Sequence, residues 1–75
     1  MNIKQKFGEK VKLLRTEKGW SQEKLALEAG IDRTYLPGIE KGERNVSITV
    51  IEKLAIALGV EIREFFDERV KIENE

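Results

Sequence analysis

Residues 21–40 read SQEKLALEAGIDRTYLPGIE, and this stretch carries the signals for two short helices joined by a tight turn. Ser21 is a favourable N-cap residue, so a first helix is predicted over residues 22–29. Gly30 ends that helix, because glycine accepts the positive φ with which a chain leaves a helix and changes direction. The first helix is therefore expected to be short and sharply terminated.

The segment after Gly30 is predicted to form a second helix that crosses the first at a steep angle. Asp32 is another N-cap candidate, and the helix is expected over about residues 33–41. Such a crossing needs a small residue at the contact, and Ala26 provides one. Apolar residues must tie both helices to one core, and the candidates are Leu25, Ala29, Ile31, Leu36 and Ile39. Together these features are typical of a helix-turn-helix, whose second helix reads bases in the major groove of DNA.

The remaining chain predicts more helices around this pair. One is expected between the N-cap Asn2 and Gly19, and another between the N-cap Ser47 and Gly59. The apolar residues at helical spacing in these two segments are Ile3, Phe7, Val11, Leu14, Val50, Ile51, Leu54 and Leu58.

A last short helix is expected over about residues 62–69. The predicted fold is therefore all-α, a compact five-helix domain over residues 1–69 followed by a short charged tail at 70–75. Nothing in the composition indicates a second domain.

The composition excludes several kinds of chemistry. The 75 residues contain no Cys and no His, which excludes disulfides, Cys/His zinc sites and imidazole general bases. A chain this short closes one small core but hardly a substrate cavity as well. We therefore expect no enzyme activity, no catalytic or metal-binding residues, no cofactor and no small-molecule substrate.

The longest apolar run, residues 54–58, is far shorter than the roughly 20 residues that span a bilayer. With no signal peptide apparent either, we expect a cytoplasmic protein without a membrane partner.

Beyond the periodicity, several short motifs carry a family resemblance. They are Arg33-Thr34-Tyr35, Gly38-Ile39-Glu40, Gly42, and the loop Glu43-Arg44-Asn45-Val46-Ser47. Over about residues 3–66 the chain resembles Xre or Cro-type, lambda-repressor-like DNA-binding domains. Within that group it is most similar to the small controller proteins of restriction-modification systems. The resemblance implies a homodimer that binds operator DNA and regulates its own gene and that of the endonuclease.

Four residues of the second helix are candidates for base contacts. The guanidinium of Arg33 can form two hydrogen bonds with a guanine. The alternative is a solvated Arg33 that pairs with Asp32 or Glu28. Thr34 can contact thymine with its methyl group and a base or phosphate with its hydroxyl. Tyr35 either lies along the groove or covers the edge of the core. Gly38 either lets the backbone approach the bases or simply marks flexibility.

A second group of residues is expected to contact phosphates. Gln22 lies among the unpaired N–H groups at the start of the first helix, and the resemblance to related repressors implies a phosphate clamp there. The alternative for Gln22 is a surface residue after a cap. The other phosphate candidates are Arg44, Asn45, Ser47 and Thr49, of which Ser47 is first of all a helix cap.

Two further positions are predicted to be structural. The resemblance implies that Arg15 and Glu40 form an ion pair between the first and third helices, and Trp20 is expected in the core. Pro37 conflicts with the helix prediction, since at the fifth position of a helix it would lack a hydrogen bond to Arg33. We expect the helix to continue through Pro37 with a kink.

One readout helix discriminates too few base pairs, so two copies on a pseudo-palindromic operator are expected. The candidate two-fold interface is the surplus apolar surface of the C-terminal half, namely Ile48, Ile51, Val60, Ile62 and Phe66. The alternative is that Phe65 and Phe66 only cap the core of the monomer.

The electrostatic support for DNA binding is thin. The chain has 14 basic and 14 acidic residues and a sequence pI near 6.3, whereas DNA-binding domains are usually basic. Residues 1–44 carry ten Lys/Arg against seven Asp/Glu, and residues 45–75 carry four against seven. Non-specific affinity should therefore be low and salt-sensitive. The competing function is an antitoxin or phage-type repressor whose main partner is another protein.

Overall fold

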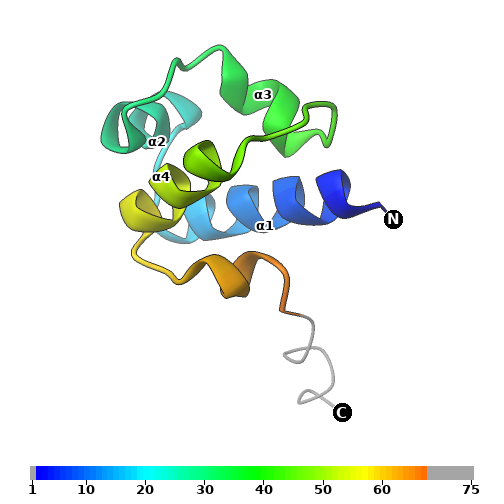
Figure 1. Ribbon diagram of the computed structural model, residues 1–75. Coiled ribbons are helices and arrows are strands. Elements are labelled where there is room, and N and C mark those ends of the chain that lie inside the picture. Colours follow the sequence, from blue (N-terminus) through cyan, green and yellow to red (C-terminus); the bar gives the residue numbers. More distant parts are fainter. Residues whose placement is uncertain (1, 68–75) are drawn as a thin grey trace.

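The computed structural model describes residues 2–67 of the chain, and over that range it is helical (Figure 1). The elements are α1 (Ile3–Glu17), α2 (Gln22–Ala29), α3 (Tyr35–Glu40), α4 (Ile48–Leu58) and the 3-10 helix η1 (Ile62–Phe65). Within residues 2–67, none of these helices has the length and apolar character required to cross a bilayer. The all-α prediction is confirmed, and α2 has the bounds expected from its cap and its terminal glycine.

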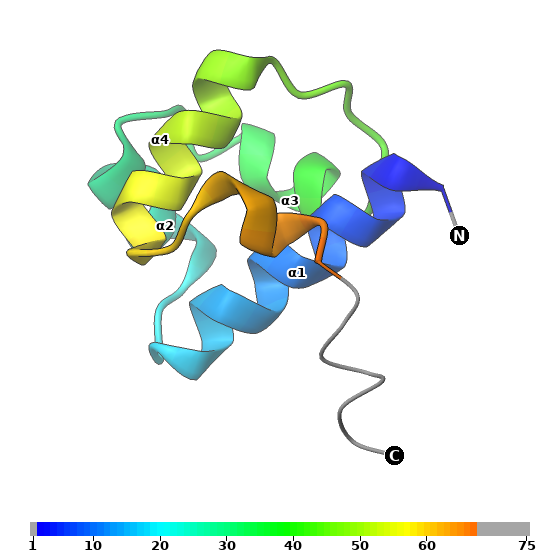
Figure 2. The ribbon, with the colours of Figure 1, turned by 60° about the horizontal axis from the view of Figure 1, so that its bottom comes forward.

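The helices pack around one core in two pairs. α3 packs on α1, and α2 packs on α4, which crosses in front of α1 in Figure 1. Figure 2 shows η1 lying beside α1 and α4. It covers the core from the side away from α3. The helix-turn-helix formed by α2 and α3 therefore stands on a base made of α1 and α4.

The core consists of the apolar faces that helical spacing predicts. Its buried residues are Phe7, Val11, Leu25, Ala26, Ala29, Leu36, Ile39, Leu54, Ala55, Leu58 and Phe65. Ile3 is an exception, since it was expected on the inward stripe of α1 but is 59% exposed. It lies one turn before Phe7 and borders a surface hollow with Val46 and Phe66 instead of reaching the core.

The predicted fifth helix over residues 62–69 is wrong in kind, since the structure has a four-residue 3-10 helix there. Backbone bonds run from Glu64 N to Glu61 O and from Phe66 N to Arg63 O, the i+3 pattern used by short helical pieces. The segment is held by Phe65, whose ring meets that of Phe7 edge-on at 4.8 Å. Residues 68 and 69, and the predicted tail at 70–75, lie outside the described residues.

The start of α3 also differs from the prediction of a helix over 33–41. Asp32 does not cap this helix. Its carboxylate accepts hydrogen bonds from Thr34 N at 2.9 Å and Thr34 Oγ1 at 2.8 Å, which makes a local turn. The helix proper begins at Tyr35, so the sequence rule identified a capping residue type but not the turn that it forms.

This shift removes the conflict at Pro37. Because α3 begins at Tyr35, Pro37 is its third residue and lies in the first turn, where backbone N–H groups have no intrahelical partner. The carbonyl of Arg33 accepts instead from Leu36 N at 3.2 Å. The expected kink is therefore not needed to accommodate the ring.

Gly8 lies at a contact between α1 and α3 that no sequence pattern indicates. A Cβ atom at this buried glycine would lie 2.2 Å from the carbonyl oxygen of Ile39 and 2.9 Å from that of Glu40. Both neighbours are backbone atoms of α3, which cannot turn aside as a side chain can. Glycine is needed here because the two helices touch.

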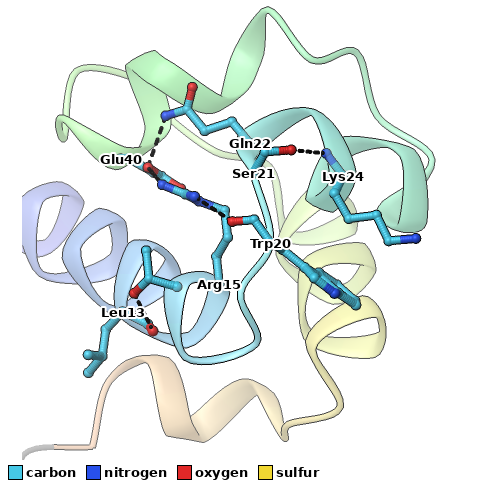
Figure 3. A network of polar contacts seen from close by, with 8 residues as sticks. Leu13, Arg15, Trp20, Ser21, Gln22, Lys24 and Glu40 are labelled. Atoms are coloured by element: carbon cyan, nitrogen blue, oxygen red, sulfur yellow. Dashed lines mark hydrogen bonds and ion pairs between the residues drawn. The ribbon is translucent and has the colours of Figure 1, made fainter.

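The end of α1 is fastened to the end of α3 by a buried network of polar side chains (Figure 3). Arg15 donates to Glu40 through Nε at 2.7 Å and through a terminal nitrogen at 2.9 Å. Its other terminal nitrogen donates to the carbonyl of Trp20 at 2.7 Å, and Gln22 Nε2 donates to Glu40 Oε1 at 3.0 Å. The hydrogen bond with Glu40 raises the pKa of Arg15. The side chains of Arg15 and Glu40 are only 11% and 4% exposed, so each charge depends on the other.

We predict that Gly8→Ala destabilises the domain although alanine is the better helix former. The helix gain is about 1 kcal/mol, whereas forcing a methyl group into packed backbone costs about 1–3 kcal/mol or more. Urea denaturation should show a lower midpoint than that of the wild type. Lys12→Ala, at an exposed position of the same helix, is the control and should change stability by less than about 0.5 kcal/mol. A Gly8→Ala midpoint at or above the wild-type value would contradict the contact.

We also predict strong coupling between Arg15 and Glu40. Arg15→Met and Glu40→Leu should each lower the free energy of unfolding by about 3–5 kcal/mol, because each leaves one buried charge unpaired. The double variant should lose much less than the sum of the two, as measured in a double-mutant cycle by urea denaturation.

The control for this cycle is Glu28→Leu, which removes the carboxylate of the exposed Lys24–Glu28 pair, where N and O are 3.0 Å apart. That loss should stay below about 1 kcal/mol. Additive losses for Arg15→Met and Glu40→Leu would show that the two side chains act independently.

Candidate nucleic-acid interface

The turn between α2 and α3 presents Arg33, Thr34 and Tyr35 on the surface. Gly30 takes the left-handed conformation with φ 72°, and Ile31 N donates back to Ala26 O at 3.0 Å, so the chain leaves α2 abruptly. Arg33 and Thr34 are exposed, and Tyr35 is 42% exposed. The three candidate base-reading side chains therefore point away from the core.

Asp32 fixes the shape of this turn. The two hydrogen bonds from Thr34, first from its backbone N–H and then from its hydroxyl, lower the pKa of Asp32 below its usual value. The carboxylate is therefore ionised in the folded protein at neutral pH. Because the folded-state pKa is the lower one, this contribution to stability is present above the usual Asp range and is lost as the pH falls through the folded value.

Arg33 forms an ion pair with Glu23 in the first turn of α2. Both side chains are about two-thirds exposed, so the pair lies on the surface and is weak. The sequence analysis named Asp32 and Glu28 as alternative partners and missed Glu23. Positions ten residues apart show no periodic signal, and only the geometry of the turn brings them together.

Gln22 lies at the start of α2, as expected, and its side chain is half-buried. Its amide nitrogen donates to Glu40, so the residue also belongs to the network that fastens α3 (Figure 3). A hollow between the starts of α2 and α3 is lined by Gln22, Arg33 and Thr34 among others. The structure thus brings one phosphate candidate and two base candidates to the same hollow.

A second hollow borders the other side of α3. Its lining includes Tyr35 from α3, and Arg44, Asn45 and Ser47 from the loop that leads to α4. The guanidinium carbon of Arg44 lies 4.9 Å from the centre of the Tyr35 ring, within the range of a cation–π contact. α3 is therefore flanked on both sides by candidate phosphate contacts.

Ser47 and Thr49 form the start of α4. Ser47 Oγ accepts from Val50 N at 3.2 Å and so acts as the N-cap, and it lies 3.0 Å from Thr49 Oγ1 in a second hydrogen bond. Both residues are exposed, as is Asn45. Their hydroxyls occupy the helix end where an anion is electrostatically favoured.

The five apolar residues predicted for a dimer interface differ in exposure. Ile48 is 81% and Ile62 is 44% exposed, whereas Ile51, Val60 and Phe66 are half-buried and pack against the core. The ring of Phe66 stacks on Phe7 with centroids 5.8 Å apart. Phe65 and Phe66 thus both cover the monomer core, and Ile48 is the residue of this group with the most free surface.

Comparison with known proteins points to one family. A helix-turn-helix model, HTH_3, matches residues 11–65. The chain is 49% identical over 67 residues to the control protein C.BamHI of Bacillus amyloliquefaciens, a match that covers 88% of this chain and 83% of that protein.

Two solved structures are similar as well. The restriction-modification controller protein C.AhdI from Aeromonas hydrophila has 55% identity and a TM-score of 0.80, with 83% of this chain and 94% of that chain covered. The biofilm regulator SinR in complex with DNA has 37% identity and a TM-score of 0.77, with 81% of this chain and 98% of that chain covered. On this evidence the resemblance inferred from residues 33–47 is confirmed, and the chain belongs to the helix-turn-helix family HTH_3.

Proposed function

We propose that this chain is a sequence-specific transcriptional regulator that binds a pseudo-palindromic operator as a homodimer. We further propose that it is the controller protein of a restriction-modification system and regulates its own gene and the endonuclease gene. The observation that carries the proposal is the exposed turn with Arg33, Thr34 and Tyr35, flanked on both sides by hollows. The similarity to C.BamHI and C.AhdI supports the assignment to a restriction-modification system.

We propose a role for each of the individual residues, and the positions of the side chains support these roles. Arg33, Thr34 and Tyr35 would face base edges in the major groove, with Arg33 exchanging Glu23 for guanine. Gly38, one turn further along the same face, was predicted to approach the bases through its backbone. Two groups of residues would hold the two phosphate backbones: Gln22 on one side of α3, and Arg44, Asn45 and Ser47 on the other, with Thr49 hydrogen-bonded to Ser47.

The dimer in this proposal uses the apolar surface of α4 and η1, on which Ile48 is the most exposed of the five candidates. A two-fold interface would place the two α3 helices about one turn of DNA apart, roughly 34 Å. The domain would comprise residues 1–69. The proposed ligand is double-stranded DNA, with no small-molecule substrate and no membrane, so the protein would act in the cytoplasm.

The deciding measurement is fluorescence anisotropy with a duplex from upstream of the protein's own gene and a scrambled duplex of equal composition, at two salt concentrations. A regulator should prefer the first duplex at both salt concentrations, while binding to the scrambled duplex weakens steeply with salt. Equal affinity for both duplexes would contradict the proposal and favour a protein partner.

We predict that Arg33→Ala removes most of the preference for the upstream duplex while the melting temperature stays unchanged. The loss of one forked base contact corresponds to about 1–3 kcal/mol, or roughly 5- to 150-fold in discrimination. Arg33→Lys should keep the attraction to phosphates but not the preference, because an ammonium cannot fork onto guanine. Lys12→Ala, which removes the same charge from α1, is the control. If Lys12→Ala weakens the preference equally, Arg33 acts only as a charge.

We predict that Ile48→Asp shifts the protein from dimer to monomer without unfolding it, because this side chain is 81% exposed in the monomer. Sedimentation equilibrium gives the association state and circular dichroism gives the fold. Leu27→Asp is the matched control on α2, where Leu27 is 74% exposed outside the proposed interface, and it should leave the dimer intact. A dimer unaffected by Ile48→Asp would place the interface elsewhere.

A further inference from the structure

Gly38 lies in the middle of α3, where glycine is a poor helix former. Replacing an interior glycine by alanine usually stabilises a helix. Gly38 is not among the positive-φ glycines of residues 2–67, so its backbone conformation does not require glycine. A reason for glycine must therefore come from the space around it.

That space is filled by Arg44. A Cβ atom at Gly38 would lie 2.9 Å from Arg44 Cγ and 3.3 Å from Arg44 Nε, both closer than ordinary contact. All three nearest neighbours belong to the Arg44 side chain, and no backbone atom is among them. The stem of Arg44 thus lies directly on the surface of α3 at this position.

The position of the stem determines where the guanidinium lies. Its carbon is 4.9 Å from the centre of the Tyr35 ring, and Tyr35 is three residues before Gly38 on the same face of the helix. The loop is fastened close by, since Glu43 N donates to Gly38 O at 2.9 Å. Arg44 therefore crosses α3 over Gly38 and stacks on Tyr35, on the surface that carries the other candidate base contacts.

From this packing we infer that Gly38 is a positioning residue that acts through Arg44. Its missing side chain leaves the space in which the stem of Arg44 lies, so that the guanidinium is held against Tyr35 before DNA arrives. The long arginine side chain has many rotamers, and a guanidinium ordered in advance loses less conformational entropy on binding. This inference rests on the proposed function and replaces the expectation that the backbone of Gly38 itself approaches the bases.

A double-mutant cycle in DNA affinity tests the inference, with wild type, Gly38→Ala, Arg44→Ala and the double variant measured on the upstream duplex. Gly38→Ala should weaken binding about 2- to 5-fold, the range of an exposed cation–π contact. In the Arg44→Ala background the same change should have no measurable effect. Tyr35→Ala should weaken binding at least as much as Gly38→Ala, because it removes both the ring against which the guanidinium lies and the proposed base contact of Tyr35.

The melting temperature is a second readout, because Gly38→Ala should improve it in the variant that lacks Arg44. In the Arg44→Ala background the clash is gone, so Gly38→Ala should raise the melting temperature through its better helix propensity. Equal losses of affinity from Gly38→Ala in both backgrounds would overturn the inference and return Gly38 to a direct backbone contact. A wild-type protein that does not prefer the upstream duplex would instead refute the proposed function, so the two failures are distinguishable.

Discussion

The forked ion pair between Arg15 and Glu40 is the contact on which the arrangement of this small domain depends. It joins the last turn of α1 to the last residue of α3, and through Gln22 and the carbonyl of Trp20 it also holds the start of α2. At Gly8 the same two helices are in contact, with no room for a Cβ atom beside the carbonyl oxygen of Ile39. α3 has its position from these two contacts, and the turn that Asp32 and Thr34 form in front of it then determines where Arg33 points.

Much of the fold could be predicted from local rules because caps and terminators act within one turn of a helix. Ser21 and Ser47 accept hydrogen bonds from the third residue after them, and Gly30 takes the expected left-handed conformation. The inward residues of α2 were predicted correctly, because residues three or four positions apart lie on the same face of a helix.

The parts that sequence reasoning missed depend on local backbone geometry or on contacts between segments, and residue type alone shows neither. Asp32 has the residue type of an N-cap, but whether its carboxylate bonds the second or the third residue ahead depends on the backbone that it enters. The pairing of Glu23 with Arg33, and of Arg44 with Tyr35, needs the turn and the loop to be in place first. Gly8 resembles a weak point in a helix until the carbonyl oxygen of Ile39 is seen beside it.

The six-residue length of α3 has a consequence of its own. Helices shorter than about 12–15 residues are marginal in water, so this one exists only while its neighbours hold it. A form of the chain in which α1 has separated from α3 would therefore not display the helix surface intact. A ligand that binds this helix surface binds only the native state. Binding therefore opposes global unfolding and the proteolysis that follows unfolding.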